Sequence, residues 1–436
     1  MFYFTCFFST LRYPCLNMRY FLSLTILVNF LVNYLQAAPT PQVQVGADLL
    51  FTKEYVHLLK NKRIGLITNH TAVNSQMKST ASLLQSHAKQ YDFTLAALFA
   101  PEHGITGSAH AAEFIKDEKD SAGIPIFSLH GATRRPTDKM LAQLDLLLYD
   151  IQDIGSRSYT YITTLFYVME EAAKRQIPVI VLDRPNPING RVIDGPLLEE
   201  KWRSIVGYIN VPYCHGMTVG ELARYFNDQS KVGCQLEVIP MRGWHRNMTF
   251  QDTGLPWIPT SPYIPEATTA YYYPVTGILG ELQIVNTGIG YTLPFKVLGA
   301  PWIDAKIFAH HLNSQKFPGV YFEPFYYRPF YGRFANEECK GVIIIITNHL
   351  IYKPVSTQYL LIGILKSLYP KEFKEALANS QDRKAMFCKV NGTDKVYQII
   401  KEEKNIVWKL RSFHEKEREA FAHQRKKYLI SSYAED

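Results

Sequence analysis

Residues 144–183, LDLLLYDIQDIGSRSYTYITTLFYVMEEAAKRQIPVIVLD, decide the fold. The two ends of this stretch, 144–150 and 177–183, are apolar runs of the length and composition of strands buried on both faces. Between them, residues 159–175 carry apolar side chains at the spacing of one helix face. A buried strand, a helix and a second buried strand in succession predict two parallel strands joined by a crossover helix.

The same pattern extends toward the N-terminus. Residues 63–68 (RIGLIT) and 93–99 (FTLAALF) are two further predicted strands, and 80–90 is the helix between them. Repeated units of this kind predict an α/β protein with a Rossmann-like, doubly wound and mostly parallel sheet.

Beyond Asp194 the alternation weakens. Thr218 and Glu221 have the spacing of a capping box and predict a helix at 218–226. The proline-rich segment 256–265 predicts an extended crossing segment. Later come a glycine-rich segment at 277–290, a strand at 341–347 and a charged helix at 402–428. We therefore expect a catalytic domain at 39–262 and a smaller α/β C-terminal domain at 263–436.

The N-terminus predicts export. An apolar run at 21–35 follows Arg19 and precedes Gln36-Ala37-Ala38 and a proline, as in a secretory signal peptide spanning residues 1–38. A secreted or periplasmic protein is expected; the alternative is an uncleaved N-terminal anchor. The four later cysteines are widely spaced and lack CxxC, which excludes a zinc ribbon but leaves disulfides open.

Composition and motifs exclude several classes. The chain has 436 residues, 47% hydrophobic and 20% charged, which is typical of a globular protein. It contains no GxGxxG after a strand, no GxxxxGK[ST], no GxSxG and no HExxH. His103 and His110 are the best candidates for a metal, but scattered histidines more often pack or cap. We expect neither a metal nor a cofactor.

Polar groups follow four consecutive predicted strands. They are Asn69-His70-Thr71, Glu102-His103, Asp150 through Arg157, and Asp183-Arg184 with Asn186. The carboxyl ends of parallel strands share one edge of a sheet, so a single cleft is predicted there.

Glu102 is the favoured catalytic group. It sits in a proline-glycine turn directly after a buried strand, where partial desolvation would raise the pKa of its carboxyl group. A protonated carboxyl can donate to a leaving-group oxygen, as the general acid of a glycosidase does. The alternative is that Glu102 caps a helix or pairs with Arg134 or Arg157.

Other strand-end residues have two interpretations each. Asp150, Asp153 and Asp183 could supply a second carboxylate or cap the following helices. Arg157 and Arg184 could grip a substrate carboxylate or neutralise a neighbouring aspartate. Tyr159 and Tyr161 open a helix, one toward the cleft and one toward the core. His215 could bind substrate or cap.

At these residues the sequence resembles the exo-β-N-acetylmuramidase family of secreted peptidoglycan hydrolases, also carried as DUF1343. The resemblance runs from about residue 45 to 430. The matching stretches are 65–71 (GLITNHT), 98–107 (LFAPEHGITG), 148–161 (LYDIQDIGSRSYTY), 181–195 (VLDRPNPINGRVIDG), 215–223 (HGMTVGELA), 253–259 (TGLPWIP), 294–304 (PFKVLGAPWID) and 421–429 (FAHQRKKYL).

The resemblance implies a Rossmann-like domain, a smaller C-terminal domain and a cleft between them. It implies release of terminal N-acetylmuramic acid from the non-reducing ends of peptidoglycan fragments, with Glu102 at the position of the family's favoured catalytic glutamate. The expected partners are peptidoglycan-derived muramyl saccharides, without nucleic acid. The positions implied to line the pocket are Asn69, His103, Asp153, Arg157, Tyr159, Asn186 and His215.

One segment departs from the family. Residues 280–296, GELQIVNTGIGYTLPFK, lack the Ser-Glu-Gly-Arg of many relatives, and Glu281 is the candidate to replace an acidic residue there. A muramic sugar has a lactyl carboxylate and a 2-acetamido group that can act as internal nucleophile, so no protein nucleophile is assigned. The alternatives are a non-catalytic binder of wall sugars and a peptidoglycan esterase or amidase.

Overall fold

The computed structural model describes residues 43–110 and 113–434. The predicted signal peptide, residues 1–38, lies outside the described residues. Among the helices of the described part, none combines the length and apolar character that a membrane span requires.

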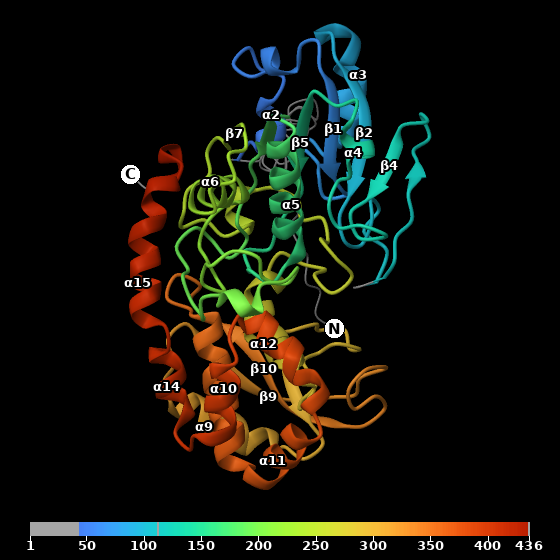
Figure 1. The fold of residues 1–436 in the computed structure, drawn as a ribbon. Helices are drawn as coiled ribbons and strands as arrows, with labels where there is room; N and C mark the ends of the chain where they lie inside the picture. Colours follow the sequence, from blue (N-terminus) through green and yellow to red (C-terminus); the bar gives the residue numbers. More distant parts are fainter. Residues whose placement is uncertain (1–42, 111–112, 435–436) are drawn as a thin grey trace, which may run out of the picture. The chain divides into compact units, whose positions relative to one another are not determined.

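A seven-stranded sheet occupies the first part of the chain (Figure 1). Its order is β3-β4-β2-β1-β5-β6-β7, and all neighbours pair in parallel except β3 and β4. The predicted Rossmann-like architecture is confirmed. The strands are β1 (Arg63–Thr68), β2 (Thr94–Ala100), β3 (Glu118–Lys119), β4 (Pro125–Ser128), β5 (Leu146–Asp150), β6 (Val179–Leu182) and β7 (Leu236–Ile239).

Strand β5 shows why these sequences form the middle of the sheet. Leu147 and Tyr149 belong to one hydrophobic cluster, whereas Leu146 and Leu148 belong to another. Successive side chains of a strand point to opposite faces, so a strand buried on both faces must be apolar throughout. The helices of this part are α2 (Gly46–Leu49), α3 (Thr80–Tyr91), α4 (Asp138–Leu141), α5 (Thr160–Lys174) and α6 (Val219–Gln229).

The chain order around β1 places a switch point between β1 and β5. From β1 the sheet grows outward through β2 and β4, and on the other side it grows through β5, β6 and β7. Loops that leave the carboxyl ends of β1 and β5 therefore diverge, and ligand sites of open α/β sheets occur at such a crevice.

The later part of the chain holds an antiparallel sheet in the order β8-β10-β9, with helices against it. This matches the expected second α/β unit, although the boundary near residue 262 stays a prediction. Its strands are β8 (Val297–Ala300), β9 (Val320–Tyr327) and β10 (Cys339–Ile346). Its helices are α7 (Thr269–Tyr272), the π-turn η4 (Tyr273–Gly277), α8 (Ile278–Gly280), α9 (Ala305–Ser314), α10 (Pro354–Leu368), α11 (Pro370–Ala378), α12 (Lys384–Asn391), α13 (Lys395–Glu402), α14 (Ile406–Ser412) and α15 (Glu415–Gln424). Short 3-10 turns are η1 (Val56–Leu59), η2 (Glu200–Trp202), η3 (Gln251–Thr253), η5 (Gln381–Arg383), η6 (Arg425–Tyr428) and η7 (Ser431–Tyr433).

The expected single helix at 402–428 is wrong. The chain forms separate helices there, and His414 adopts a left-handed conformation with φ of 57° that breaks the run before α15. After the break the tail packs against helix α6, where Phe421 and Tyr428 make edge contacts with Tyr225. Strands β3, β4 and β7 were not expected from the sequence, because runs of two to four residues carry little periodicity.

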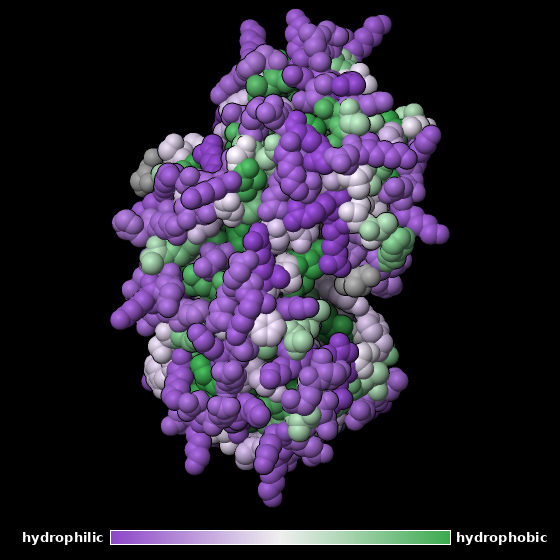
Figure 2. Space-filling model, in the orientation of Figure 1, coloured by the Kyte–Doolittle hydropathy of each residue, from purple (hydrophilic) through white to green (hydrophobic). Residues whose placement is uncertain are grey.

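Hydrophobic side chains are concentrated in the interior. The face in Figure 2 is mostly hydrophilic, with hydrophobic residues reaching it in small groups.

Cys214, Cys234, Cys339 and Cys388 are buried free thiols, so the disulfide left open by the sequence is not formed among them.

Candidate functional site

Four of the predicted site residues meet at one cavity of about 250 Å³. Glu102, His103 and Tyr159 come from the large-sheet part, and Glu281 comes from the later part. The remaining lining residues are Ser158, Thr160, Val206, Ser261, Tyr263, Ile264, Tyr273, Phe295, Met386 and Val390. The cavity has room for about one sugar ring and is bordered by both parts of the chain.

The Glu102 carboxyl group is held at the start of helix α5. Its Oε2 accepts a hydrogen bond of 2.6 Å from Thr160 Oγ1, and Thr160 is the first residue of that helix. The Glu102 side chain is only 12% exposed. One carboxyl oxygen is therefore held in place, and the side chain is largely shielded from water. A general acid needs such a fixed position, because it must deliver its proton to one particular atom.

His130 lies beside the other carboxyl oxygen, with 3.6 Å between its Nε2 and Glu102 Oε1. Burial lowers the pKa of His130, and the nearby Arg134 and His103 lower it further, while Glu102 opposes them. The ring is thus neutral at neutral pH. His130 was not among the predicted site residues, because it follows β4, a strand too short to be predicted from the sequence. Its position at a fifth strand end was the available signal.

His103 is held in a left-handed conformation, with φ of 70°. Its Nδ1 donates a hydrogen bond of 2.7 Å to the carbonyl of Ala109, and its ring meets the edge of Tyr161. Such conformations are costly for residues other than glycine and occur often at functional sites. The sequence had offered His103 together with His110 as candidate metal ligands. Within the described ranges, no group of three or more His, Cys, Asp or Glu side chains is arranged to hold a metal.

Tyrosines form one wall of the cavity. Tyr159 Oη donates to Thr260 Oγ1 at 2.8 Å, and Tyr161 Oη donates to the carbonyl of the same residue at 2.6 Å. The ring of Tyr273 lies edge-on to Tyr159, with 6.1 Å between centroids. The predicted crossing segment, 256–265, is thereby fastened to the first residues of α5.

Glu281 supplies a second carboxyl group to the cavity, directly after helix α8. Burial raises its pKa, and Arg383 counteracts that effect in part. The sequence indicated this residue only by its position within the segment that departs from the family.

The structure corrects the expectation that Arg157 lines the pocket. Its side chain is fully buried, and its guanidinium donates to the carbonyls of Pro196, Val211, Val390 and Asn391 at 2.6–3.1 Å. Burial lowers its pKa to about 10. Its Nη1 and Nη2 are engaged by the backbone of loops and of helix α12, and Arg157 is not among the residues that line the cavity, so it is not placed to grip a substrate carboxylate there.

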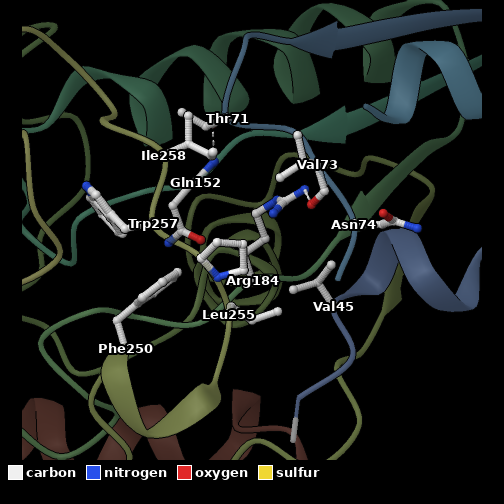
Figure 3. Close-up of a pocket in the computed structure, with 11 residues that line it drawn as sticks. Val45, Thr71, Val73, Asn74, Gln152, Arg184, Phe250, Leu255, Trp257 and Ile258 are labelled. Carbon is white, nitrogen blue, oxygen red and sulfur yellow. Dashed lines mark hydrogen bonds between the residues drawn. The ribbon is translucent and has the colours of Figure 1, made fainter. Parts of the chain in front are cut away.

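Arg184 also has a structural role, the alternative that the sequence left open. It forms a buried ion pair with Asp150 (Nη2 to Oδ2, 2.9 Å) and donates to the carbonyl of Val73 at 2.8 Å. Figure 3 shows it at a small cavity with Gln152 and Trp257. That space, about 20 Å³, fits one water molecule and excludes a sugar.

Asn69 and Asp153 lie at the switch point but not at the larger cavity. Asn69 Oδ1 accepts hydrogen bonds from the backbone amide and the hydroxyl of Thr71. The Thr71 hydroxyl in turn accepts one from the backbone amide of Gln152, which is the bond dashed in Figure 3. Asp153 Oδ2 accepts from the amide of Gly155 at 2.7 Å, and burial raises the pKa of Asp153 to about 7. The bonds from Asn69 through Thr71 to Gln152 join the two diverging loops, whereas the Asp153 bond lies within the second of them.

Asn186 joins the loop after β6 to the segment before α6 and contacts the loop after β5. Its Nδ2 donates to the carbonyl of Met217 and its Oδ1 accepts from the amide of Ile188, both at 3.0 Å. Gly155 packs directly on it: a Cβ at Gly155 would lie 2.1 Å from Asn186 Oδ1, and the φ of 80° also favours glycine.

The structure also corrects the expectation that His215 lines the pocket. Its side chain has no exposed surface, its Nδ1 accepts from the amide of Met217 at 3.2 Å, and burial lowers its pKa to about 3. It lies outside the cavity lining. Asp183 caps α6, because it accepts from Thr218 Oγ1 and from the amide of Gly220.

Comparisons with known proteins agree with this architecture. Residues 64–268 match the family model described as exo-beta-N-acetylmuramidase NamZ, N-terminal, and residues 271–430 match the C-terminal model of the same family. The chain belongs to the NamZ exo-β-N-acetylmuramidase family. The resemblance identified in the sequence is confirmed, and membership makes the chain a glycoside hydrolase.

Relatives of the NamZ family align over most of their length. The peptidoglycan beta-N-acetylmuramidase NamZ of Bacillus subtilis (strain 168) is 39% identical over 402 residues, which cover 91% of this chain and 93% of that protein. A crystal structure of a DUF1343 family protein from Bacteroides fragilis has a TM-score of 0.83 at 38% identity, covering 90% of this chain and all of that one. A second from the same organism has a TM-score of 0.70 at 30% identity, covering 90% and 99%.

Proposed function

We propose that this protein releases terminal N-acetylmuramic acid from the non-reducing ends of peptidoglycan fragments, with Glu102 as general acid. The observation that carries the proposal is the largely buried Glu102 carboxyl group in a cavity of about 250 Å³, with Thr160 bonded to one of its oxygens. The Bacillus subtilis relative is a peptidoglycan beta-N-acetylmuramidase, which supports the choice of sugar.

The acid step requires a proton on Glu102 when substrate is bound. Glu102 then gives this proton to the glycosidic oxygen as the bond to C1 of the muramic sugar breaks. A positively charged histidine beside the carboxyl would hold it as an anion, but the lowered pKa of His130 leaves that ring neutral. His130 therefore fills the space beside Oε1 without withdrawing the proton.

Glu281 is the second acid–base group in the proposal. A carboxylate whose pKa is raised by burial takes up a proton more readily than one in water. It is suited to receive the proton of an attacking water, or that of the amide when the substrate's 2-acetamido oxygen attacks C1. The water route inverts the anomeric configuration and the acetamido route retains it, so NMR of the fresh product distinguishes them.

Binding of the lactyl carboxylate does not use the arginines that the sequence suggested. Both Arg157 and Arg184 are engaged inside the protein, and the described residues that line the cavity include no lysine or arginine. Other polar groups of the lining can meet the sugar and its substituents, among them His103 and the hydroxyl groups of Ser158, Ser261 and Tyr263. The Ser158 hydroxyl also forms a hydrogen bond of 2.6 Å with Tyr213 Oη.

The test is release of a chromogenic aglycone from a β-N-acetylmuramide. We expect Glu102→Gln to lower kcat by roughly 100-fold or more, within the range of general-acid contributions. Glu113→Gln, at an exposed glutamate outside the cavity lining, is the matched control. Near-normal release by Glu102→Gln would overturn the assignment, provided that circular dichroism shows both variants folded.

Product analysis tests the reaction class. Only a glycosidase produces a new reducing sugar from a peptidoglycan fragment, whereas an amidase or esterase leaves the glycan ends unchanged. Measurable affinity for muramyl fragments without turnover over long incubation would favour a non-catalytic binder instead.

We also propose that residues 1–38 direct export and are removed. The support is the order of basic, apolar and small residues before Pro39. Fractionation of the producing cells and N-terminal sequencing of the recovered protein test it; recovery of the full-length chain from the cytoplasm would contradict it.

A further inference from the structure

A second cavity, of about 670 Å³, lies among helices α10, α11 and α13. It shares no lining residue with the Glu102 cavity. In Figure 1 both α10 and α11 lie in the later part of the chain, and the two helices pack against each other. Its volume falls within the range of small-molecule sites, and the proposed hydrolysis makes no use of it.

The floor of this cavity is apolar. Phe373 and Leu377 come from α11, and Tyr397 and Ile400 come from α13. All four side chains belong to the hydrophobic core and have at most 7% of their surface exposed. The core of this helical layer therefore continues to the wall of the cavity, where an apolar ligand would remove further surface from water.

The rim of the cavity is positively charged. Lys374, Lys401 and Lys404 line it, are exposed, and form no ion pair with any residue that the structure describes. Among its described lining residues there is no aspartate or glutamate. Lys366 differs, because its Nζ donates to the carbonyls of Ile400 and Glu403 and so closes the end of α13.

We infer that this cavity binds a small amphiphilic anion, with a short aliphatic chain on the apolar floor and a carboxylate at the lysine rim. A neutral apolar molecule would leave three unpaired ammonium groups around it, and a polar anion would leave the apolar floor in contact with water. A molecule that has both parts satisfies both surfaces, and charge complementarity selects the anion over a cation of the same chain length.

The test uses calorimetric titration with octanoate, octylammonium and 1-octanol, which share one chain and differ in charge. We expect octanoate to bind most tightly. The double variant Lys374→Glu/Lys404→Glu should weaken octanoate binding by roughly tenfold or more, because two favourable charge contacts become repulsive. It should leave the affinity for 1-octanol nearly unchanged.

Two further variants keep the test decisive. Lys371→Glu reverses a charge on the same helix at an exposed residue outside the cavity lining, and it should bind octanoate nearly as well as the wild type. Ala378→Trp, at an exposed residue of the lining, should reduce binding of octanoate and 1-octanol alike by filling the space. Far-UV circular dichroism reports that each variant is folded.

Equal binding of the three probes would overturn the inference, as would an equal loss in Lys371→Glu. Failure of octanoate to bind at millimolar concentration would overturn it too. None of these outcomes depends on Glu102, so the inference and the proposed hydrolysis can fail separately.

Discussion

Two groups of polar side chains follow strands of the same sheet, and only one of them faces a cavity large enough for a sugar. After β2, Glu102 is held by Thr160 beside a space of about 250 Å³. At the carboxyl ends of β5 and β6, Asp150 and Arg184 pair with each other beside a space of about 20 Å³. A polar residue at a strand end is thus a candidate for catalysis when its side chain also borders a cavity that a substrate can enter.

The Asp150–Arg184 pair offers the largest contrast. In Arg184→Ala the fully buried Asp150 loses its charged partner, and we expect the free energy of unfolding to fall by about 3–5 kcal/mol. Urea denaturation measures the loss. Arg63→Ala removes the exposed pair with Asp145 and should cost much less, because solvent-exposed ion pairs contribute little to stability. Equal losses in the two variants would show that burial does not separate these pairs.

Asp153 extends the same contrast to pH. Burial raises its pKa from 3.8 to about 7, so its ionisation is costly in the folded state. The unfolded chain releases this proton at lower pH than the folded chain does, so stability falls as pH rises between about 4 and 7. Asp153→Asn should remove that decline and raise the free energy of unfolding at pH 8 by on the order of 3 kcal/mol. An unchanged pH dependence in denaturant titrations would contradict this.

Substitution of Glu281 should lower activity without lowering stability. Glu281→Gln removes the proposed acid–base group, and we expect kcat to fall by roughly 100-fold. Because burial raises the pKa of Glu281, its charged form destabilises the fold above its unfolded pKa. The variant should therefore be at least as stable as the wild type at pH 7. A variant that is both active and less stable would assign Glu281 to structure instead.

The sheet was predictable because its central strands are apolar on both faces, as in β5 with Leu146 to Tyr149. The site was predictable in part. Glu102 could be found from its position after a long strand, whereas His130 was lost with β4, whose four residues carry no clear period. Glu281 could be indicated only through the family resemblance, because its approach to Glu102 depends on the packing of two parts of the chain.

The arginines show the physical limit of such predictions. Whether Arg157 reaches a substrate depends on the carbonyls of Val390 and Asn391, more than 200 residues later in the chain. Whether Arg184 reaches a substrate depends on its bonds to Asp150 and to the carbonyl of Val73. Each candidate partner is visible in the sequence, but the choice among them is made by tertiary contacts.

Thr160 allows the smallest and sharpest test. Its hydroxyl donates to Glu102 Oε2, and a donor to a carboxylate favours the charged form. In Thr160→Val the carboxyl loses this bond, so we expect kcat to fall by about tenfold and the alkaline limb of the pH–rate profile to move to higher pH. Thr163→Val, on the same helix and outside the cavity lining, replaces a buried hydroxyl that has no hydrogen-bond partner among the described residues, and it should leave the profile unchanged. A fall in kcat without a moved limb would mean that Thr160 orients Glu102 but does not influence its proton, whereas an effect equal to that of Thr163→Val would separate the hydroxyl from the chemistry altogether.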